Sequence, residues 1–285
     1  MRFLRRICPA ALALLLLFSG CANTPTESAD DKPAVTDPYG ITLEGGITDG
    51  GLAEQKTNFP LYAALPGDDF YLYGINPHGM VLYHKNNGCY FDWPGLTPRG
   101  ILPKMSYFDC DGDGKKELAV TLYWASGTEL SLMDLHILKI EEHKDSWPPV
   151  EYRDYAILSQ DGSSQFGDGS PSEIDKLLNE NFPFILADGG KTVSFIMDGK
   201  EYSANNDFDE DANFFEGIVY GNIVHFDIQD DHSITAEIAI GFKYENFAFP
   251  QYFADVIADV SFDGKQFKFS NKRINFHTQG EESAP

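Results

Sequence analysis

The sequence predicts a mainly β protein, made of antiparallel hairpins and meanders, with one short helix near 172–181. Short runs of alternating apolar and polar residues recur along 59–278, which is the period of a β-strand. Turn-forming pairs such as Asp-Gly separate these runs, and only one segment has the start and stop signals of a helix. With 285 residues, of which 42% are hydrophobic and 14% aromatic, the chain can bury a substantial core.

Residues 1–20 have the organisation of an export signal. Three arginines precede an apolar run over 10–18, about half as long as a membrane-spanning helix, so this segment targets the chain and is then removed. Small residues lead to Cys21, a pattern that resembles a bacterial lipobox, although Phe18 stands where leucine is usual. The resemblance implies that Cys21 is lipidated and anchors the protein to the outer face of the cell membrane. Residues 21–58 are polar and predict a flexible tether.

The first β region spans 59–145. Apolar runs at 70–76 and 79–84 flank an Asn-Pro-His turn and predict a hairpin. The run 118–123 is apolar on both faces, which is typical of a central strand. The return strand over 133–137 has three apolar residues on one face and an aspartate and a histidine on the other.

Between these strands lies a loop with the spacing of a calcium site. Acids stand at loop positions 1, 3, 5 and 9, a glycine at position 6 permits a sharp turn, and position 7 offers a backbone carbonyl. Calcium takes six to eight oxygen ligands at about 2.3–2.6 Å, which alternating acids on a tight loop can supply. The predicted ligands are Asp109, Asp111, Asp113, Lys115 and Glu117.

The loop is not an EF-hand, because position 12 is Val120 and a strand follows instead of a helix. DCDGDGKKEL running into a strand resembles the calcium loops of FG-GAP and VCBS repeats, the blades of integrin-α-type propellers. The segments around it resemble VCBS-repeat-containing lipoproteins of anaerobic Gram-positive bacteria. That resemblance implies a β architecture and an extracytoplasmic location, and it implies no activity. A closed propeller of seven blades would need more residues, which leaves an incomplete propeller, a sandwich or two packed meanders.

The remainder of the chain is predicted as a connecting segment and a second β region. Residues 146–190 read as a connecting loop with the short helix, 191–278 as antiparallel hairpins, and 279–285 as a disordered tail. Asp198-Gly199 and Asp263-Gly264 predict two-residue turns, and 229–232 predicts a third turn.

Cysteine placement leaves one question open. Cys8 leaves with the signal and Cys21 takes lipid, so Cys89 and Cys110 remain, either as a disulfide or as two free thiols. A disulfide would close a loop of about twenty residues and contribute about 3 kcal/mol. The reducing habitat of the resembled family favours the free thiols.

Charge and motifs bound the function. A formal net charge of −23 repels phosphate backbones, which argues against nucleic-acid binding. No metal-binding histidine pair, nucleophile elbow or phosphate-binding glycine loop occurs. The acidic run 207–211 lacks a glycine turn and reads as a solvated loop in preference to a second cation site. Aromatic clusters, including 244–253, can stack on sugars, although aromatics in β proteins more often fill cores.

We therefore expect a lipid-anchored extracytoplasmic protein with a structural calcium loop, which binds an unknown protein or glycan ligand. An enzyme is the less favoured class. The first alternative is a cell-wall or polysaccharide hydrolase that uses a pair of carboxylates. The second is a structural or regulatory protein of the cell envelope.

Overall fold

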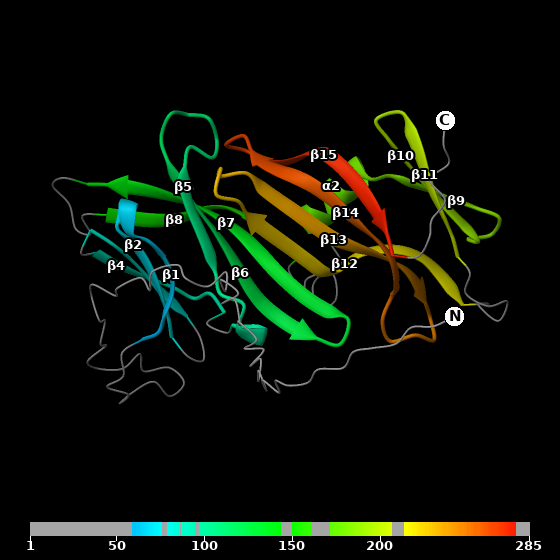
Figure 1. Ribbon diagram of the computed structural model, residues 1–285, viewed down its shortest axis with the longest axis horizontal. Helices are drawn as coiled ribbons and strands as arrows, with labels where there is room; N and C mark the ends of the chain where they lie inside the picture. Colours follow the sequence, from blue (N-terminus) through cyan, green and yellow to red (C-terminus); the bar gives the residue numbers. More distant parts are fainter. Residues whose placement is uncertain are drawn as a thin grey trace, which may run out of the picture. The chain divides into compact units, whose positions relative to one another are not determined.

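The computed structural model describes residues 59–75, 79–85, 87–94, 97–143, 150–160, 172–206 and 214–277 (Figure 1). The predicted signal, the lipidation site Cys21, the tether, the acidic run 207–211 and the tail 279–285 lie outside these residues. Within the described ranges, no helix is both long and apolar enough to cross a membrane.

The described strands form three sheets, and the prediction of a mainly β chain with one short helix is confirmed. A four-stranded antiparallel sheet has the order β1-β2-β3-β4, with β1 Leu61–Leu65, β2 Phe70–Gly74, β3 Met80–His84 and β4 Asn87–Phe91. A three-stranded sheet has the order β11-β10-β9, with β9 Phe184–Ala187, β10 Thr192–Met197 and β11 Lys200–Asn205. Two 3-10 turns are η1 Pro66–Asp68 and η2 Pro98–Gly100.

The largest sheet has eight strands and joins both predicted β regions. Its order is β15-β14-β13-β12-β7-β6-β5, and β8 also pairs with β7. Its strands are β5 Lys104–Phe108, β6 Glu117–Gly127, β7 Leu130–Glu142, β8 Val150–Leu158, β12 Phe215–Ile228, β13 Ile234–Tyr244, β14 Gln251–Phe262 and β15 Phe267–Phe276. The meanders β5–β8 and β12–β15 are joined edge to edge in this sheet, through β7 and β12.

One strand pair in this sheet is parallel. The start of β7 pairs with β12 through Ser131 and Leu132, while the second half of β7 pairs with β8 on the same side. The sheet is curled, and its β5 edge meets the turn between β12 and β13. There Ser106 Oγ lies 2.6 Å from His232 Nδ1, and the rings of Phe108 and His232 stack at 5.3 Å.

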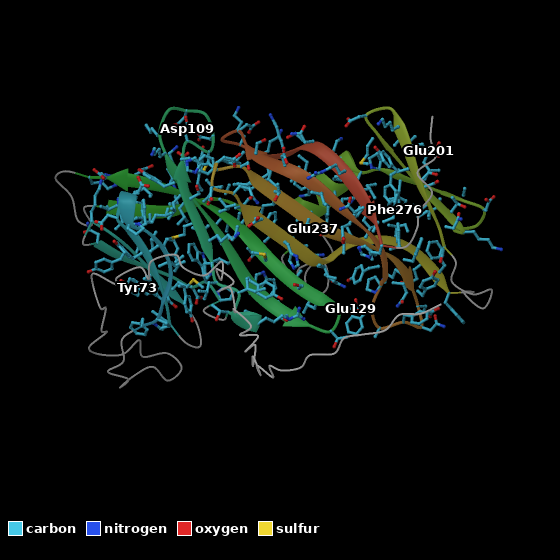
Figure 2. All side chains as sticks on the ribbon, in the orientation of Figure 1. Tyr73, Asp109, Glu129, Glu201, Glu237 and Phe276 are labelled. Carbon is cyan, nitrogen blue, oxygen red and sulfur yellow. The ribbon has the colours of Figure 1, made fainter. Side chains whose placement is uncertain are left out.

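Strand β6 divides two hydrophobic cores. Leu118, Val120 and Leu122 pack toward the four-stranded sheet with Phe70 and other apolar residues. Ala119 and Tyr123 point the opposite way, into the larger core formed with β12 to β15. Burial on both faces confirms the prediction that this strand is central. Figure 2 shows the side chains along β6, from Asp109 in the loop before this strand to Glu129 in the turn after it.

Among the residues that the structure describes, the one α-helix is α2 Glu173–Asn181, which confirms the predicted helix near 172–181. Ser172 caps its first turn, because the Ser172 hydroxyl accepts a hydrogen bond from the Asp175 amide, while the Asp175 carboxylate accepts one from the Ser172 amide. Ile174, Leu177 and Leu178 are buried in the larger core, so the helix covers one part of it.

Turn predictions hold unevenly. Asp198 and Gly199 both have positive φ and connect β10 directly to β11, as a two-residue hairpin turn requires. The predicted two-residue turn at Asp263-Gly264 is displaced by one residue. The Asp263 amide donates to the Gln266 carbonyl at 3.2 Å, so Gly264 and Lys265 are the central residues, and the Asp263 carboxylate accepts the Lys265 and Gln266 amides. The predicted connecting segment 146–190 also contains two strands, β8 and β9, that were missed. Strand β8 was missed because the Trp-Pro-Pro and Gly/Ser segments on either side of it read as one long connecting loop.

Candidate metal centre

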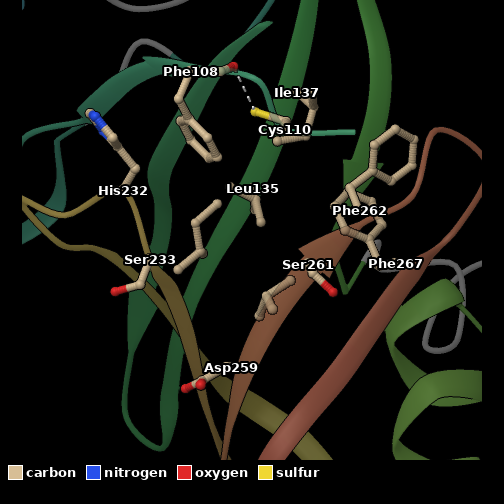
Figure 3. A pocket seen from close by; sticks show the side chains of 12 residues that line it. Phe108, Cys110, Leu135, Ile137, His232, Ser233, Asp259, Ser261, Phe262 and Phe267 are labelled. Atoms are coloured by element: carbon tan, nitrogen blue, oxygen red, sulfur yellow. Dashed lines mark hydrogen bonds between the residues drawn. The ribbon is translucent and has the colours of Figure 1, made fainter. Parts of the chain in front are cut away.

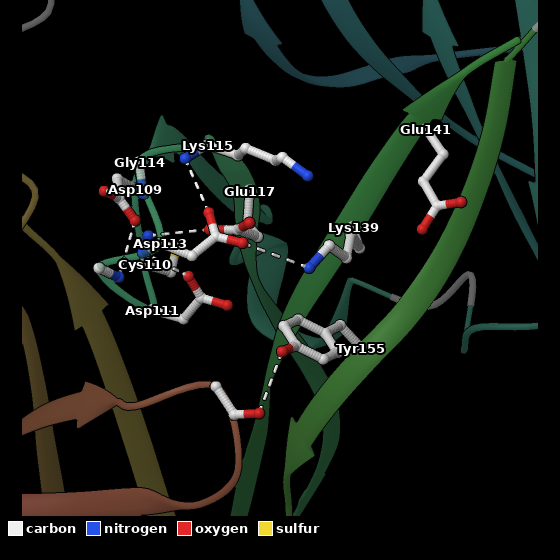
Figure 4. A network of polar contacts seen from close by, with 12 residues as sticks. Asp109, Cys110, Asp111, Asp113, Gly114, Lys115, Glu117, Lys139, Glu141 and Tyr155 are labelled. Atoms are coloured by element: carbon white, nitrogen blue, oxygen red, sulfur yellow. Dashed lines mark hydrogen bonds and ion pairs between the residues drawn. The ribbon is translucent and has the colours of Figure 1, made fainter.

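The acidic loop connects β5 to β6 and is closed by the pair Phe108 and Glu117. Each aspartate in it accepts backbone amides of later loop residues: Asp109 from Gly112 at 2.7 Å and Gly114 at 3.0 Å, and Asp111 from Asp113 at 3.0 Å. Both glycines have positive φ, which residues with a Cβ rarely adopt. Short-range hydrogen bonds therefore curl the loop on itself (Figure 4).

Three of the predicted ligands converge. Asp109, Asp111 and Glu117 each place one carboxylate oxygen so that all three oxygens lie within 4.8 Å of one another. Two ligands of one calcium ion, each at about 2.5 Å, can be no more than about 5 Å apart, so this spacing suits a shared cation. Asp109 is exposed, Asp111 is partly buried and Glu117 is fully buried, so the group extends from the surface into the interior.

Glu117 is the most buried of the three converging acids. Its side chain is 0% exposed; Oε2 accepts the Cys110 amide at 3.0 Å, but Oε1 has no hydrogen-bond partner in the described part of the chain. Loss of hydration raises the pKa of the Glu117 carboxyl, the Cys110 amide opposes that rise, and the negative charge of Asp111 adds to it. A buried carboxylate oxygen without a partner is costly, and a divalent cation would satisfy it.

Asp113 has a different environment from the converging acids. Its Oδ1 accepts the Lys115 amide at 2.7 Å, and its Oδ2 lies 3.6 Å from Lys139 Nζ on β7. The Lys139 ammonium also lies over the Tyr155 ring, 4.6 Å from its centroid. Burial tends to lower the pKa of Lys139, but Tyr155 and the loop acids outweigh burial and raise it. Lys139 therefore neutralises part of the negative charge of the loop.

The structure thus groups the predicted ligands unevenly. One centre is formed by Asp109, Asp111 and Glu117. Asp113 instead faces Lys139, and its carboxylate accepts a hydrogen bond from the Lys115 backbone amide. Three carboxylates fit a calcium ion as part of its coordination, and backbone carbonyls and water would complete it. Sequence reasoning did not identify the supporting residues Lys139, Tyr155 and Gly264. They come from distant strands, and the sequence contains no local signal for them.

The turn between β14 and β15 lies close to the acidic loop. The Tyr155 hydroxyl donates to the Gly264 carbonyl at 3.0 Å. Gly264 has φ +83, and a Cβ there would lie 3.3 Å from Asp111 Oδ2, so the turn passes close to the acids. Figure 4 shows this turn beside Asp111 and Tyr155.

Cys110 connects the acidic loop to a neighbouring apolar pocket of about 130 Å³ (Figure 3). Its amide binds Glu117, while its side chain lines the pocket with Phe108, Leu135 and Phe262. This burial raises the pKa of the Cys110 thiol, which is therefore neutral at physiological pH. The thiol donates to the Phe108 carbonyl oxygen at 3.6 Å.

Cys89 and Cys110 are both free thiols in the structure. Cys89 packs against the core on the side of the four-stranded sheet, whereas Cys110 packs against the larger core. Because β6 lies between these two cores, the thiols belong to opposite faces of the sheet.

A second acidic group is less suited to a cation. Glu141, His143 and Glu151 also bring one ligand atom each within 4.8 Å, but none of the three residues is buried. His143 Nε2 lies 3.4 Å from Glu151, and Arg153 lies 3.5 Å from Glu141, so ordinary surface ion pairs explain the grouping.

Glu117 is the one buried acid among the described residues, so that part of the chain contains no pair of buried, facing carboxylates for the hydrolase alternative.

Comparisons with protein-family models, curated proteins and solved structures found no match to the chain.

Proposed function

We propose that this chain is a calcium-stabilised binding protein, anchored by lipid on Cys21 to the outer face of the cell membrane. The observation that supports the metal is the fully buried Glu117, whose unpartnered Oε1 accompanies the convergence with Asp109 and Asp111. The export signal and the lipobox-like pattern support the location. The resemblance to VCBS and FG-GAP loops supports calcium over other hard cations.

The cation has a structural role in this proposal. At about 1 mM calcium outside the cell and a Kd of about 10⁻⁴ M, binding contributes about 1.4 kcal/mol to stability. That energy orders a loop but is too small to drive the folding of the whole chain. The ordered loop in turn supports the β5–β6 hairpin, whose last pair before the loop is Phe108 and Glu117.

Thermal unfolding of the full-length protein in detergent, with calcium and with a chelator, tests the metal. We expect calcium to raise the midpoint by about 3 °C. Glu117→Gln keeps the shape of the side chain but removes its charge, so it should abolish the shift. Glu151→Gln, in the exposed group on β8, is the matched control and should preserve it.

Two further variants sharpen the test. Asp109→Asn should abolish the shift, whereas Asp113→Asn should retain most of it because Asp113 faces Lys139. An equal midpoint in calcium and chelator for the unchanged protein would remove the cation from the proposal. For the location, Cys21→Ser should release the protein from the membrane fraction, and continued membrane association would contradict the lipid anchor.

A further inference from the structure

A second cavity, of about 390 Å³, lies away from the acidic loop and is built from four parts of the chain. These are Gln160, which follows the end of β8, one face of α2, the middle of β12, and the loop between β13 and β14. We refer to it as the amide pocket, because three of its residues, Gln160, Asn179 and Asn222, have carboxamide side chains. Its volume lies in the range typical of small-molecule sites.

Two phenylalanines at the amide pocket are exposed. Phe247 is 47% and Phe249 is 41% exposed, whereas nearby Phe242 and Phe253 are buried at 2% and 7%. The Phe247 ring is held by an edge contact with Tyr244, with centroids 5.6 Å apart. Aromatic rings in this stretch were expected to fill the core, and these two depart from that expectation.

The backbone fixes the Gln160 amide in the pocket. Gly221 lies at a bulge in β12, where the pairing with β13 shifts, and has φ +99. A Cβ at Gly221 would lie 1.9 Å from Gln160 Nε2, so the glycine makes room for the amide. Gln160 Oε1 accepts a hydrogen bond from the backbone amide of Asn222 at 2.9 Å. The Nε2 group of Gln160 can therefore donate to another partner.

The loop with the two phenylalanines is fixed in the same way. Gly241 on β13 packs so closely that a Cβ there would lie 2.6 Å from the Cβ of Pro250. The loop therefore folds back onto β13, and Phe247 and Phe249 line the same cavity as the carboxamides. This arrangement is preorganised, which lowers the entropy cost of binding.

The charged groups of the amide pocket already have partners within the chain. Lys243 pairs with Glu216 at 2.9 Å, and Asp175 belongs to the cap of α2. Neither charge requires a charged ligand, and the formal net charge of −23 repels anionic ones. Planar amides donate to and accept from adjacent hydroxyl groups, and exposed rings stack on the C–H faces of sugars.

We propose that the amide pocket binds a neutral saccharide, with Phe247 and Phe249 as stacking surfaces and Gln160 as a hydrogen-bond donor. This inference names the ligand class of the binding protein proposed above and so rests on that function. It does not require calcium at the acidic loop.

Isothermal titration of the full-length protein in detergent tests the ligand class. The probes are neutral hexasaccharides of glucose, mannose and N-acetylglucosamine, with polygalacturonate as the anionic probe and a mixture of uncharged peptides as the alternative class. We expect saturable binding of at least one neutral saccharide, with little change in affinity when salt is raised.

Variants then assign the binding to the pocket. The double variant Phe247→Ala, Phe249→Ala and the single variant Gln160→Leu should each weaken binding about tenfold. Phe214→Ala is the matched control, because Phe214 is 46% exposed but does not line the pocket, and it should leave the affinity unchanged. Thermal midpoints verify that each variant folds. If the double variant does not fold, Gln160→Leu still tests the proposal.

Three results would overturn the proposal: no binding of any neutral saccharide, affinity that these variants leave unchanged, or preference for polygalacturonate or the peptides. The calcium-dependent midpoint is measured on the same samples. A lost saccharide interaction with a retained calcium shift would reject this ligand class alone. A retained saccharide interaction with no calcium shift would reject the metal alone.

Discussion

His84 on β3 is buried without a full set of hydrogen bonds. Its side chain is 3% exposed, its ring stacks on Phe70 with centroids 4.0 Å apart, and its Nδ1 has no partner in the described part of the chain. Burial lowers the pKa of His84, and the nearby Lys85 ammonium lowers it further. Three acids oppose the shift without cancelling it: Asp69, Glu142 and Asp68. The Tyr152 ring meets the imidazole edge-on at 6.3 Å.

This shift predicts that the fold loses stability in mild acid. The pKa of His84 in the folded chain lies below its unfolded value of about 6.5, so the unfolded chain takes up the proton first as the pH falls. The stability contributed by neutral His84 is fully present above about pH 6.5 and is lost as the pH falls below that value. Denaturant midpoints measured from about pH 8 to about pH 5 should fall, and His84→Phe, which retains stacking on Phe70, should flatten part of the decline.

His225 on β12 is the natural comparison. Burial also lowers the pKa of this histidine, and its Nε2 lies 2.7 Å from Ser131 Oγ. His225 should account for a second part of the acid sensitivity, which His84→Phe leaves in place. An unaltered pH profile in His84→Phe would show that its protonation is not linked to folding.

Lys139 lies beside the acidic loop and competes electrostatically with any cation there. Lys139→Met keeps much of the side-chain volume and removes the positive charge. We expect about tenfold tighter calcium binding and lower stability in chelator, because the loop acids then repel one another unopposed. Calcium titration followed by thermal midpoint measures both effects. Lys200→Met on the exposed β11 is the control, and equal calcium affinity in the two variants would contradict this role for Lys139.

At the scale of elements, α2 depends on its first turn. The helix buries Ile174, Leu177 and Leu178, but its nine residues are too few for stability on their own. The reciprocal hydrogen bonds between Ser172 and Asp175 satisfy amides that the helix itself leaves without partners.

Ser172→Ala should therefore lower the free energy of unfolding by about 1 kcal/mol. Denaturant unfolding followed by far-ultraviolet circular dichroism measures this change. Ser270→Ala, on the exposed side of β15, is the control and should change stability by less than about 0.5 kcal/mol. Equal stability of the two variants would mean that the cap does not support the helix.

Local signals predicted the elements that depend on nearby residues. The Asp198-Gly199 turn and the capped helix need only a few adjacent residues, and both were found. The acid spacing likewise located the loop. Strand β8 was missed because its flanking turns hid it, and the parallel pairing of β7 with β12 joins segments about ninety residues apart. Which acids converge, and that Lys139 faces them, depends on such distant packing and not on the loop sequence.

At the scale of the molecule, the two cores share one wall. Strands β6 and β7 send Leu122 and Leu138 into one core and Ala119 and Leu135 into the other. Neither core can open without removing packing from this wall, so the described region should unfold in a single cooperative transition.

Truncations on the two sides test this coupling. Leu138→Ala and Leu135→Ala should each cost about 2–5 kcal/mol and should each lower the same midpoint. In a Trp124→Phe, Trp147→Phe background, tryptophan fluorescence reports on Trp93 alone, which packs in the smaller core. Far-ultraviolet circular dichroism reports on all strands. Coincident curves are expected in both variants, and separate transitions would show that the cores unfold independently.

The position of β6 between two hydrophobic cores affects how the register of this strand is determined. A strand with one wet face resists slippage, because a shift of one residue would place its apolar side chains in water. For β6, a shifted strand would still be buried on both sides, so hydrophobicity alone does not select the native alignment. Glu117, at the first position of the strand and hydrogen-bonded to the Cys110 amide, supplies the missing reference point. The acidic loop therefore helps to set the register of the β5–β6 hairpin.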